Sequence, residues 1–272
     1  MNNSQRKIQT ADANPRNTLF LAFRKIRKNR KMKSVKALAL VVAASFAFSF
    51  SHAQTVEELQ QKYFDALGGK AKLATLKNVY QEANMAIMGM ELPSKMWIVF
   101  GAAMRQEIEV QGQKIITFIN SNSGWSINPL MGAATAQPLP EDAVKENAGA
   151  VLAPGGQLAS YKDYGYTASY EGKEDVDGKP AYKIRLAKDS SESFFYIDVS
   201  TNYLTRNITK SNAMGQQTEV TTTFSDYKKT PEGYVFPYTS VINNPMIGEI
   251  KATLTKLEVN RAVDVKELEK QN

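Results

Sequence analysis

Two blocks of residues in which apolar and polar side chains alternate constrain the fold of this chain more than any other feature. Such a two-residue period is typical of β-strands that bury one face. The stretch from Asn120 to Leu139 (NSNSGWSINPLMGAATAQPL) separates the two blocks. Within it, Asn128-Pro129 ends a strand, because the residue before proline disfavours helical geometry and proline lacks a backbone donor. Alternation is lost over residues 140–160, so the sequence predicts one antiparallel sheet interrupted by a helical insert at residues 138–160.

The first block predicts a five-stranded meander, and the second predicts further strands between residues 164 and 259, about eleven in all. Gln111-Gly112 and Asp177-Gly178 are typical of two-residue hairpin turns. Before the sheet, the pair Thr55 and Glu58 forms a capping box that predicts a helix over about residues 56–67. A sheet with one apolar face must cover that face by curling, by helices or by both. The fold class predicted is mainly β (α+β), with a single curved antiparallel sheet.

An export signal precedes the sheet. The segment Met32 to Ala53 has two early lysines, an uncharged run over residues 37–51 and the ending Ser51-His52-Ala53. This order predicts a secretory signal peptide cleaved after Ala53, with Met32 as the true start. The apolar run is shorter than the roughly 20 residues of a membrane-spanning helix, so a permanent anchor is the weaker interpretation. We expect residues 1–53 to be removed and residues 54–272 to form one domain.

Removal of residues 1–53 reverses the sign of the net charge. That segment holds 11 of the 34 Lys and Arg residues and one of the 27 Asp and Glu residues, so the remaining chain carries −3. The basic excess of the full sequence therefore does not indicate a nucleic-acid partner. Residue 54 is Gln, so attachment of lipid to a cysteine at that position is impossible.

The absence of cysteine and the position of the single histidine limit the chemistry of the exported domain. The chain has no Cys, and His52 lies in the predicted signal peptide. Disulfides, a Ser-His-Asp triad, a Cys-His dyad and an ordinary zinc site are thereby excluded from residues 54–272. We expect no cofactor, no metal and no enzymatic activity, and a hydrolase that uses two carboxylates stays open as an alternative.

The pieces together resemble the LolA-like periplasmic carrier family, the outer-membrane lipoprotein-sorting proteins. The resemblance rests on Lys62 to Leu73 (KYFDALGGKAKL), on Trp125 to Ala136, and on Tyr196-Ile197-Asp198. It implies an incomplete barrel with a helical lid, in the periplasm of a Gram-negative envelope, whose concave apolar face holds lipoprotein acyl chains. For the domain itself we expect a monomer that meets an envelope membrane protein transiently. Where those carriers have an arginine before a proline that latches the lid, this chain has Phe100-Gly101, and the nearest arginine is Arg105.

Ten residues on neighbouring predicted strands are candidates for the ligand-binding face: Met85, Ile87, Met96, Ile98, Ile108, Trp125, Ile127, Ile184, Leu186 and Phe224. The methionines suit a surface that must adapt to variable chains, and they also suit plain core packing. Trp125 is either a wall of the cavity or a buried anchor. Strand parity turns Glu107 to the opposite face from Ile108.

Four further residues are candidates for a lid: Val144, Val151, Leu152 and Leu158. The break at Pro154-Gly155-Gly156 suits a hinge, and the alternative is a static helix that caps the sheet. For the whole domain, the leading hypothesis is a carrier for an acylated or otherwise hydrophobic ligand. The alternative is a protein-interaction module in envelope signalling or secretion, in which the cavity is incidental.

Overall fold

The structure is a computed structural model that describes residues 54–271, apart from residues 142–143, 146–147, 149–151, 190 and 214–215. The predicted signal peptide lies outside the described residues. Gln54–Asn272 forms a compact unit of its own. Of the helices in the described ranges, none combines the length and the apolar character needed to cross a membrane.

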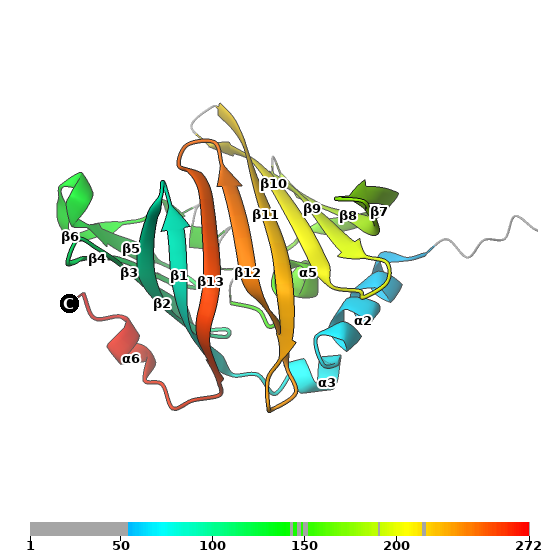
Figure 1. The fold of residues 1–272 in the computed structure, drawn as a ribbon, viewed down its shortest axis with the longest axis horizontal. Helices are drawn as coiled ribbons and strands as arrows, with labels where there is room; N and C mark the ends of the chain where they lie inside the picture. Colours follow the sequence, from blue (N-terminus) through cyan, green and yellow to red (C-terminus); the bar gives the residue numbers. More distant parts are fainter. Residues whose placement is uncertain are drawn as a thin grey trace, which may run out of the picture. The chain divides into compact units, whose positions relative to one another are not determined.

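Thirteen antiparallel strands of the described residues form one open sheet (Figure 1). Its order is β6-β5-β4-β3-β2-β1-β13-β12-β11-β10-β9-β8-β7, so two meanders meet at the β1–β13 pair. The strands of the first meander are β1 (Asn78–Ile87), β2 (Met90–Val99), β3 (Ala103–Val110), β4 (Gln113–Asn120), β5 (Gly124–Asn128) and β6 (Ala133–Pro138). Those of the second are β7 (Thr167–Val176), β8 (Lys179–Lys188), β9 (Ser191–Asp198), β10 (Leu204–Ala213), β11 (Gln216–Lys229), β12 (Val235–Asn244) and β13 (Gly248–Val259).

This arrangement confirms the predicted mainly β fold and the incomplete barrel, with thirteen strands in place of about eleven. Strand β6 lies in the stretch that was predicted to end the first block. Its sequence, Ala-Ala-Thr-Ala-Gln-Pro, has no large apolar residue to produce an alternating pattern. It follows the 3-10 turn η1 (Pro129–Met131), which closes at Gly132 in the left-handed conformation (φ 79°).

Both predicted two-residue hairpin turns are confirmed. Gln111-Gly112 and Asp177-Gly178 have positive φ at both positions, as the tight turn that matches strand twist requires. A third turn of this kind joins β1 to β2 at Met88-Gly89.

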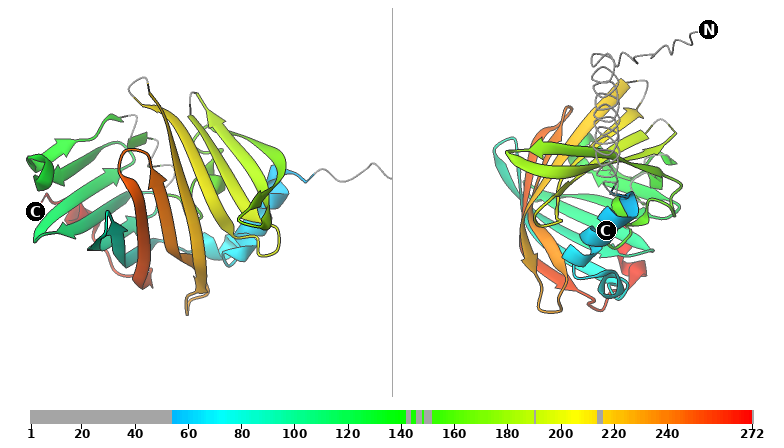
Figure 2. Two further views of the ribbon diagram at one scale, coloured as in Figure 1. Left: turned by 45° about the horizontal axis from the view of Figure 1, so that its top comes forward. Right: turned by 90° about the vertical axis from the view of Figure 1, so that its right-hand side faces the viewer.

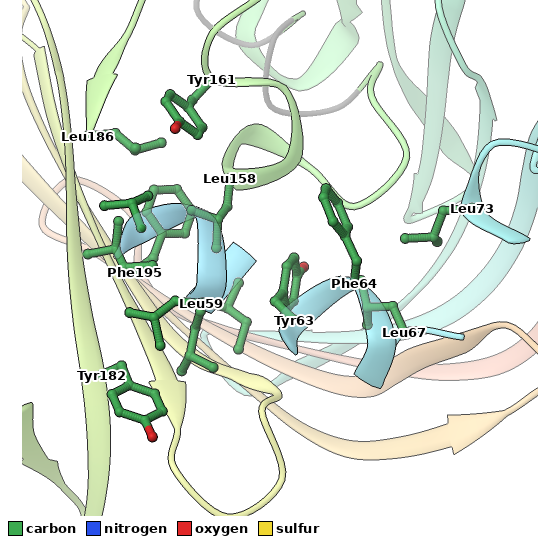
Figure 3. Packing of buried hydrophobic residues seen from close by; sticks show 14 of the residues in the cluster. Leu59, Tyr63, Phe64, Leu67, Leu73, Leu158, Tyr161, Tyr182, Leu186 and Phe195 are labelled. Atoms are coloured by element: carbon green, nitrogen blue, oxygen red, sulfur yellow. The ribbon is translucent and has the colours of Figure 1, made fainter. Parts of the chain in front are cut away.

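The short helix α2 (Val56–Ala66) lies in the hollow of the curved sheet, followed by α3 (Lys70–Leu73) (Figure 2). Its capping box is formed: the Glu58 amide donates to Thr55 Oγ1 at 3.1 Å, and the Thr55 amide donates to Glu58 Oε2 at 3.2 Å. Apolar residues at helical spacing, with Leu59 and Tyr63 among them, turn the helix onto the sheet and form the main core (Figure 3).

A second apolar cluster covers the opposite, outer face of β3, β4 and β5. Trp125, Ile127 and Phe118 pack there against Leu268 of the C-terminal helix α6 (Val265–Leu268). The sheet is therefore apolar on both faces in this region, which the alternating pattern does not reveal.

Candidate ligand-binding cavity

A cavity of about 520 Å³ lies between the concave face of the sheet and the covering helices. Volumes of this size are typical of small-molecule sites. The strands contribute Gln81, Ala83, Met85, Ser94, Met96, Ile98, Gln106, Phe195, Leu204, Asn207, Thr209, Phe224, Tyr227, Val235, Phe236, Pro237, Tyr238, Ser240, Ile242, Ala252 and Leu254. The helical side and the loops contribute Tyr63, Leu67, Leu73, Leu76, Phe100, Ala153, Gly155, Gly156, Gln157 and Leu158. None of these lining residues carries a charge.

Strand register explains why the lining residues face inward together. Met85 of β1 lies opposite Ala252 of β13, and Ala83 lies opposite Leu254, so two consecutive inward positions coincide on the two central strands. On the other side of β1, Gln81 lies opposite Met96 of β2. Because successive side chains of a strand alternate between faces, one fixed register places all these residues on the same wall.

The helical side of the cavity is held by hydrogen bonds between α2 and the insert. Tyr63 Oη donates to the Gly155 carbonyl at 3.2 Å, and Gln60 Nε2 donates to the Leu158 carbonyl at 2.7 Å. Gly155 has φ 86°, and a Cβ atom at this position would lie 2.9 Å from Cβ of Ala159. A glycine is therefore required where the insert turns against α2. The insert continues into α5 (Gln157–Ser160), whose Leu158 is fully buried in the main core.

The polar groups of the wall are neutral and mostly partnered within the protein. Asn207 Nδ2 donates to the Phe194 carbonyl at 3.3 Å, and Tyr227 Oη donates to the Leu204 carbonyl at 2.6 Å. Burial raises the pKa of Tyr63 and the pKa of Tyr227 well above the ordinary tyrosine value. Both phenols are therefore uncharged at physiological pH, and the cavity presents an uncharged lining to a ligand.

Four of the ten candidate strand residues line the cavity: Met85, Met96, Ile98 and Phe224. Ile87 and Ile108 lie on the same face, in a small cluster with Met85 beside the cavity. The structure places Glu107 on the other face, where it pairs with Arg105 and Lys114.

The remaining four candidates do not line the cavity. Ile184 and Leu186 lie on the concave face but are completely buried in the core that packs against α2. Trp125 and Ile127 lie on the outer face beneath α6, so their assignment to the ligand-binding face is corrected. The inward positions of β5 are the small residues Gly124 and Ser126, which pair with Ile119 and Thr117 of β4.

The insert covers part of the concave face. Val144 and Leu152 are buried against Met104 and Ile119, in a cluster that Met96 and Ile98 border. The Gly101 amide donates to the Leu152 carbonyl at 2.8 Å and so ties the insert to the β2–β3 turn. Leu158 lines the cavity, and Val151 lies outside the described residues.

Arg105 serves a different purpose from a lid latch. Its guanidinium lies on the outer face, where Nη1 donates to the carbonyls of Leu268 at 2.9 Å and Lys270 at 2.6 Å. Arg105 Nε also pairs with Glu107 at 2.9 Å. The residue therefore fixes the C-terminal segment on the back of the sheet.

Sequence reasoning missed the cavity residues of the helices and of β12. Tyr63 and Leu67 were recognised only as the apolar stripe of a helix, although a helix in the hollow of a sheet also faces any space beneath it. Phe236, Ser240 and Ile242 alternate along β12 and could have been found by extending the strand parity used for β1 and β2.

The fold and the site define a class of protein: an open antiparallel half-barrel that encloses an uncharged cavity between its concave face and short helices.

No family model and no curated protein matches the sequence. Solved structures share the fold, among them the following two. A LolA superfamily protein from Nitrosomonas europaea has a TM-score of 0.53 and 12% identity, over 80% of this chain and 99% of that one. A domain assigned to outer membrane lipoprotein sorting from Vibrio parahaemolyticus has a TM-score of 0.52 and 11% identity, over 79% and 97%. The predicted LolA-like fold is confirmed.

Proposed function

We propose that this protein binds and carries an acyl chain, from a lipoprotein or another lipid, in the periplasm. The observation that carries the proposal is the uncharged cavity of about 520 Å³ on the concave face. The LolA-like fold supports it, because the two similar structures are a LolA superfamily protein and a lipoprotein-sorting domain. In this proposal residues 1–53 are removed on export and the domain acts as a monomer that meets a membrane-protein partner transiently.

The energetics of an uncharged wall suit an aliphatic ligand. Each methylene moved from water into an apolar site contributes about 0.8 kcal/mol, so a chain of about fourteen carbons gains about 11 kcal/mol before ordering costs. Affinity of this kind requires no charged contact. Adaptable side chains such as Met85 and Met96 can follow different chain shapes.

We propose binding and transport without catalysis. A hydrolase with two carboxylates needs both acids beside the bound substrate, and none of the residues that line the cavity is acidic. The protein-interaction alternative predicts a cavity that stays empty, and the experiment below separates it from the carrier proposal.

A matched pair of substitutions on β13 tests the proposal. Leu254 lines the cavity, whereas its neighbour Thr253 is exposed on the outer face. We expect Leu254→Glu to abolish binding of a fluorescent fatty-acid probe, because a carboxylate in the wall must be desolvated when the chain enters. Thr253→Glu, with the same added charge one residue away, should bind like the wild type.

Circular dichroism of both variants controls for folding. A wild-type protein that binds no acyl probe would refute the carrier proposal and favour the interaction alternative. Equal loss in the two folded variants would refute the assignment of the wall. Ile108→Glu should weaken binding in the same way, but Glu107→Lys is a poor control because it would place three cations together with Arg105 and Lys114.

A further inference from the structure

The turns at one end of the sheet expose large apolar side chains. Hairpins of an antiparallel sheet alternate between its ends, so the β1–β2, β3–β4, β5–β6, β12–β13 and β8–β9 turns lie at one end of the sheet (Figure 1). We call the first four, which follow one another from β6 to β12 in the sheet order, the rim. Every exposed large apolar residue in the described part of the chain lies on this rim: Met88, Met90, Leu130, Met131, Met246 and Ile247. Met88, Met131 and Met246 are more than 80% exposed. Exposed apolar residues that gather in this way mark an interaction surface.

Strand register brings two of these turns together. Ile87 of β1 lies opposite Met90 on one side and opposite Ile250 of β13 on the other. Ile250 in turn lies opposite Ile242 of β12. The turns that carry Met88 and Met246 are therefore neighbours at the centre of the rim.

The four rim turns contain no charged residue. They are residues 88–90, 111–113, 129–132 and 244–248, in a chain of which 22% is Asp, Glu, Lys or Arg. The β7–β8 and β11–β12 turns at the other end of the sheet carry Asp177 and Glu232, and the β8–β9 turn, at the same end as the rim but beyond β10 and β11, carries Lys188 and Asp189. The first charges behind two of the rim turns are the exposed acids Glu91 and Glu249. A surface of this kind does not match an anionic partner.

Met88 occupies a backbone position that does not favour it. Its φ is 51°, in a two-residue turn whose first position normally holds Asn, Asp or Gly. A long side chain in the left-handed region costs conformational energy, and at 81% exposure Met88 recovers little of it by packing. The local fold therefore does not explain the exposed thioether.

The rim is continuous with the cavity along the concave face. Ile87, Ile108, Ile115 and Ile250 are only partly buried, and they pack beside Met85, which lines the cavity. Ile242 also lines the cavity and lies two residues from the β12–β13 turn. An unbroken aliphatic surface thus leads from the exposed turns to the cavity.

We propose that the rim inserts its turns into the surface of a zwitterionic lipid bilayer, so that an acyl chain passes between membrane and cavity along this aliphatic surface. The proposal rests on the proposed carrier function. The exposed side chains stand on separate turns and do not line a shared groove. Such a surface suits a partner, such as a bilayer, whose binding needs no shape complementarity. The acids behind them disfavour anionic lipid, and apolar burial in the interface supplies the binding.

Single cysteines test the insertion, because the chain contains none of its own. Met88→Cys, Met131→Cys and Met246→Cys, each labelled with an environment-sensitive dye, report from the rim. Glu232→Cys reports from the exposed β11–β12 turn at the other end of the sheet. With phosphatidylcholine vesicles we expect a blue shift and a rise in emission at the three rim positions and no change at residue 232.

Unlabelled variants measure the strength of the contact. We expect Met246→Ser to lower vesicle binding about tenfold, since burial of one large aliphatic side chain corresponds to about one decade in partition. Glu232→Ser should bind as the wild type does. Vesicles with added anionic lipid should bind no better than phosphatidylcholine alone.

Several outcomes would overturn the proposal. One is unchanged emission from the dyes at the three rim positions when vesicles are added, and another is an equal change in emission at residue 232. A third is a change at the rim positions that occurs without vesicles and grows with protein concentration, which would indicate contact with a second copy of the chain. Fatty-acid-probe binding without vesicles is measured on the same samples. If the protein binds the fatty-acid probe but the rim dyes do not respond to vesicles, only the membrane proposal is refuted. If the rim dyes respond to vesicles but the protein does not bind the probe, the carrier function is refuted.

Discussion

Asp198, at the end of β9, is a buried carboxylate satisfied by its own turn. Its Oδ1 accepts from the amides of Ser200 at 2.9 Å and Thr201 at 2.8 Å, and from both hydroxyls. Burial alone would raise the pKa of Asp198, but the hydrogen bonds from Ser200 and Thr201 outweigh it and lower the pKa below the ordinary value. A lowered folded-state pKa stabilises the protein above the unfolded pKa and loses that effect as the pH falls through the folded value.

We therefore expect Asp198→Asn to lower the free energy of unfolding by about 2 kcal/mol at pH 7. The difference from the wild type should shrink as the pH falls below about 4, where the unfolded chain takes up the proton, and should continue to shrink until the pH has passed the lowered folded-state pKa. Urea unfolding at pH 7 and at pH 3 measures both values. An equal difference at the two pH values would contradict the assigned role of the charge.

Arg105 provides a second prediction at this scale. Its removal in Arg105→Met leaves Glu107 with Lys114 alone and frees the carbonyls of Leu268 and Lys270. We expect a loss of about 3 kcal/mol in unfolding free energy, because breaking a buried charge pair leaves a partner uncompensated. Binding of the fatty-acid probe by the folded variant should not change, since Arg105 lies on the outer face. Unaltered stability in denaturant unfolding would show that the C-terminal segment is held in another way.

Trp125 shows where residue-level prediction fails. Parity along β1 placed Met85 on the cavity side, because its neighbours Asn84 and Ala86 are polar or small. In β5 the large residues were assumed to face inward, yet Gly124 and Ser126 do so. The outer face of β5 is buried by α6, and the apolar spacing of Val265 and Leu268 was the one signal in the sequence for that cover.

Among the elements, the insert is the one that the sequence predicts to act as a lid. Its residues Ala153, Gly155, Gly156, Gln157 and Leu158 line the cavity, and the segment is held by hydrogen bonds from Tyr63 and Gln60 of α2. If this segment opens to admit an acyl chain, its backbone amide hydrogens should exchange with solvent slowly only when ligand is bound.

We expect acyl ligand to slow amide exchange in residues 152–160 several-fold while β8, in the packed core, stays unchanged. Hydrogen exchange read by mass spectrometry makes the comparison. Gly155→Ala should speed exchange in the ligand-free segment, because the added Cβ meets Ala159. A static cap would give equal protection with and without ligand.

Elements with strong local signals were predicted well. The capping box of α2 and the turns at Gln111-Gly112 and Asp177-Gly178 follow from a few adjacent residues. Strand β6 was missed because it has no large apolar residue, and the C-terminal helix was missed because its place depends on β3, β4 and β5, far away in the sequence.

For the whole molecule, the open sheet of two meanders makes a hollow that α2 and the insert fill only in part. Alternation predicted the single sheet, and the need to cover its apolar face predicted the curvature. Register could not be read from the sequence, so the extent of the cavity on β9 to β12 became visible only in the structure.

The central claim is that the cavity holds an acyl chain, and native mass spectrometry of protein purified from its own cell envelope tests it most directly. We predict a polypeptide that begins at Gln54 and carries one acyl-bearing adduct, which organic solvent releases and which Leu254→Glu lacks while Thr253→Glu retains it. A folded wild-type protein that carries no lipid, and takes up none when acyl lipid is supplied, would contradict the account.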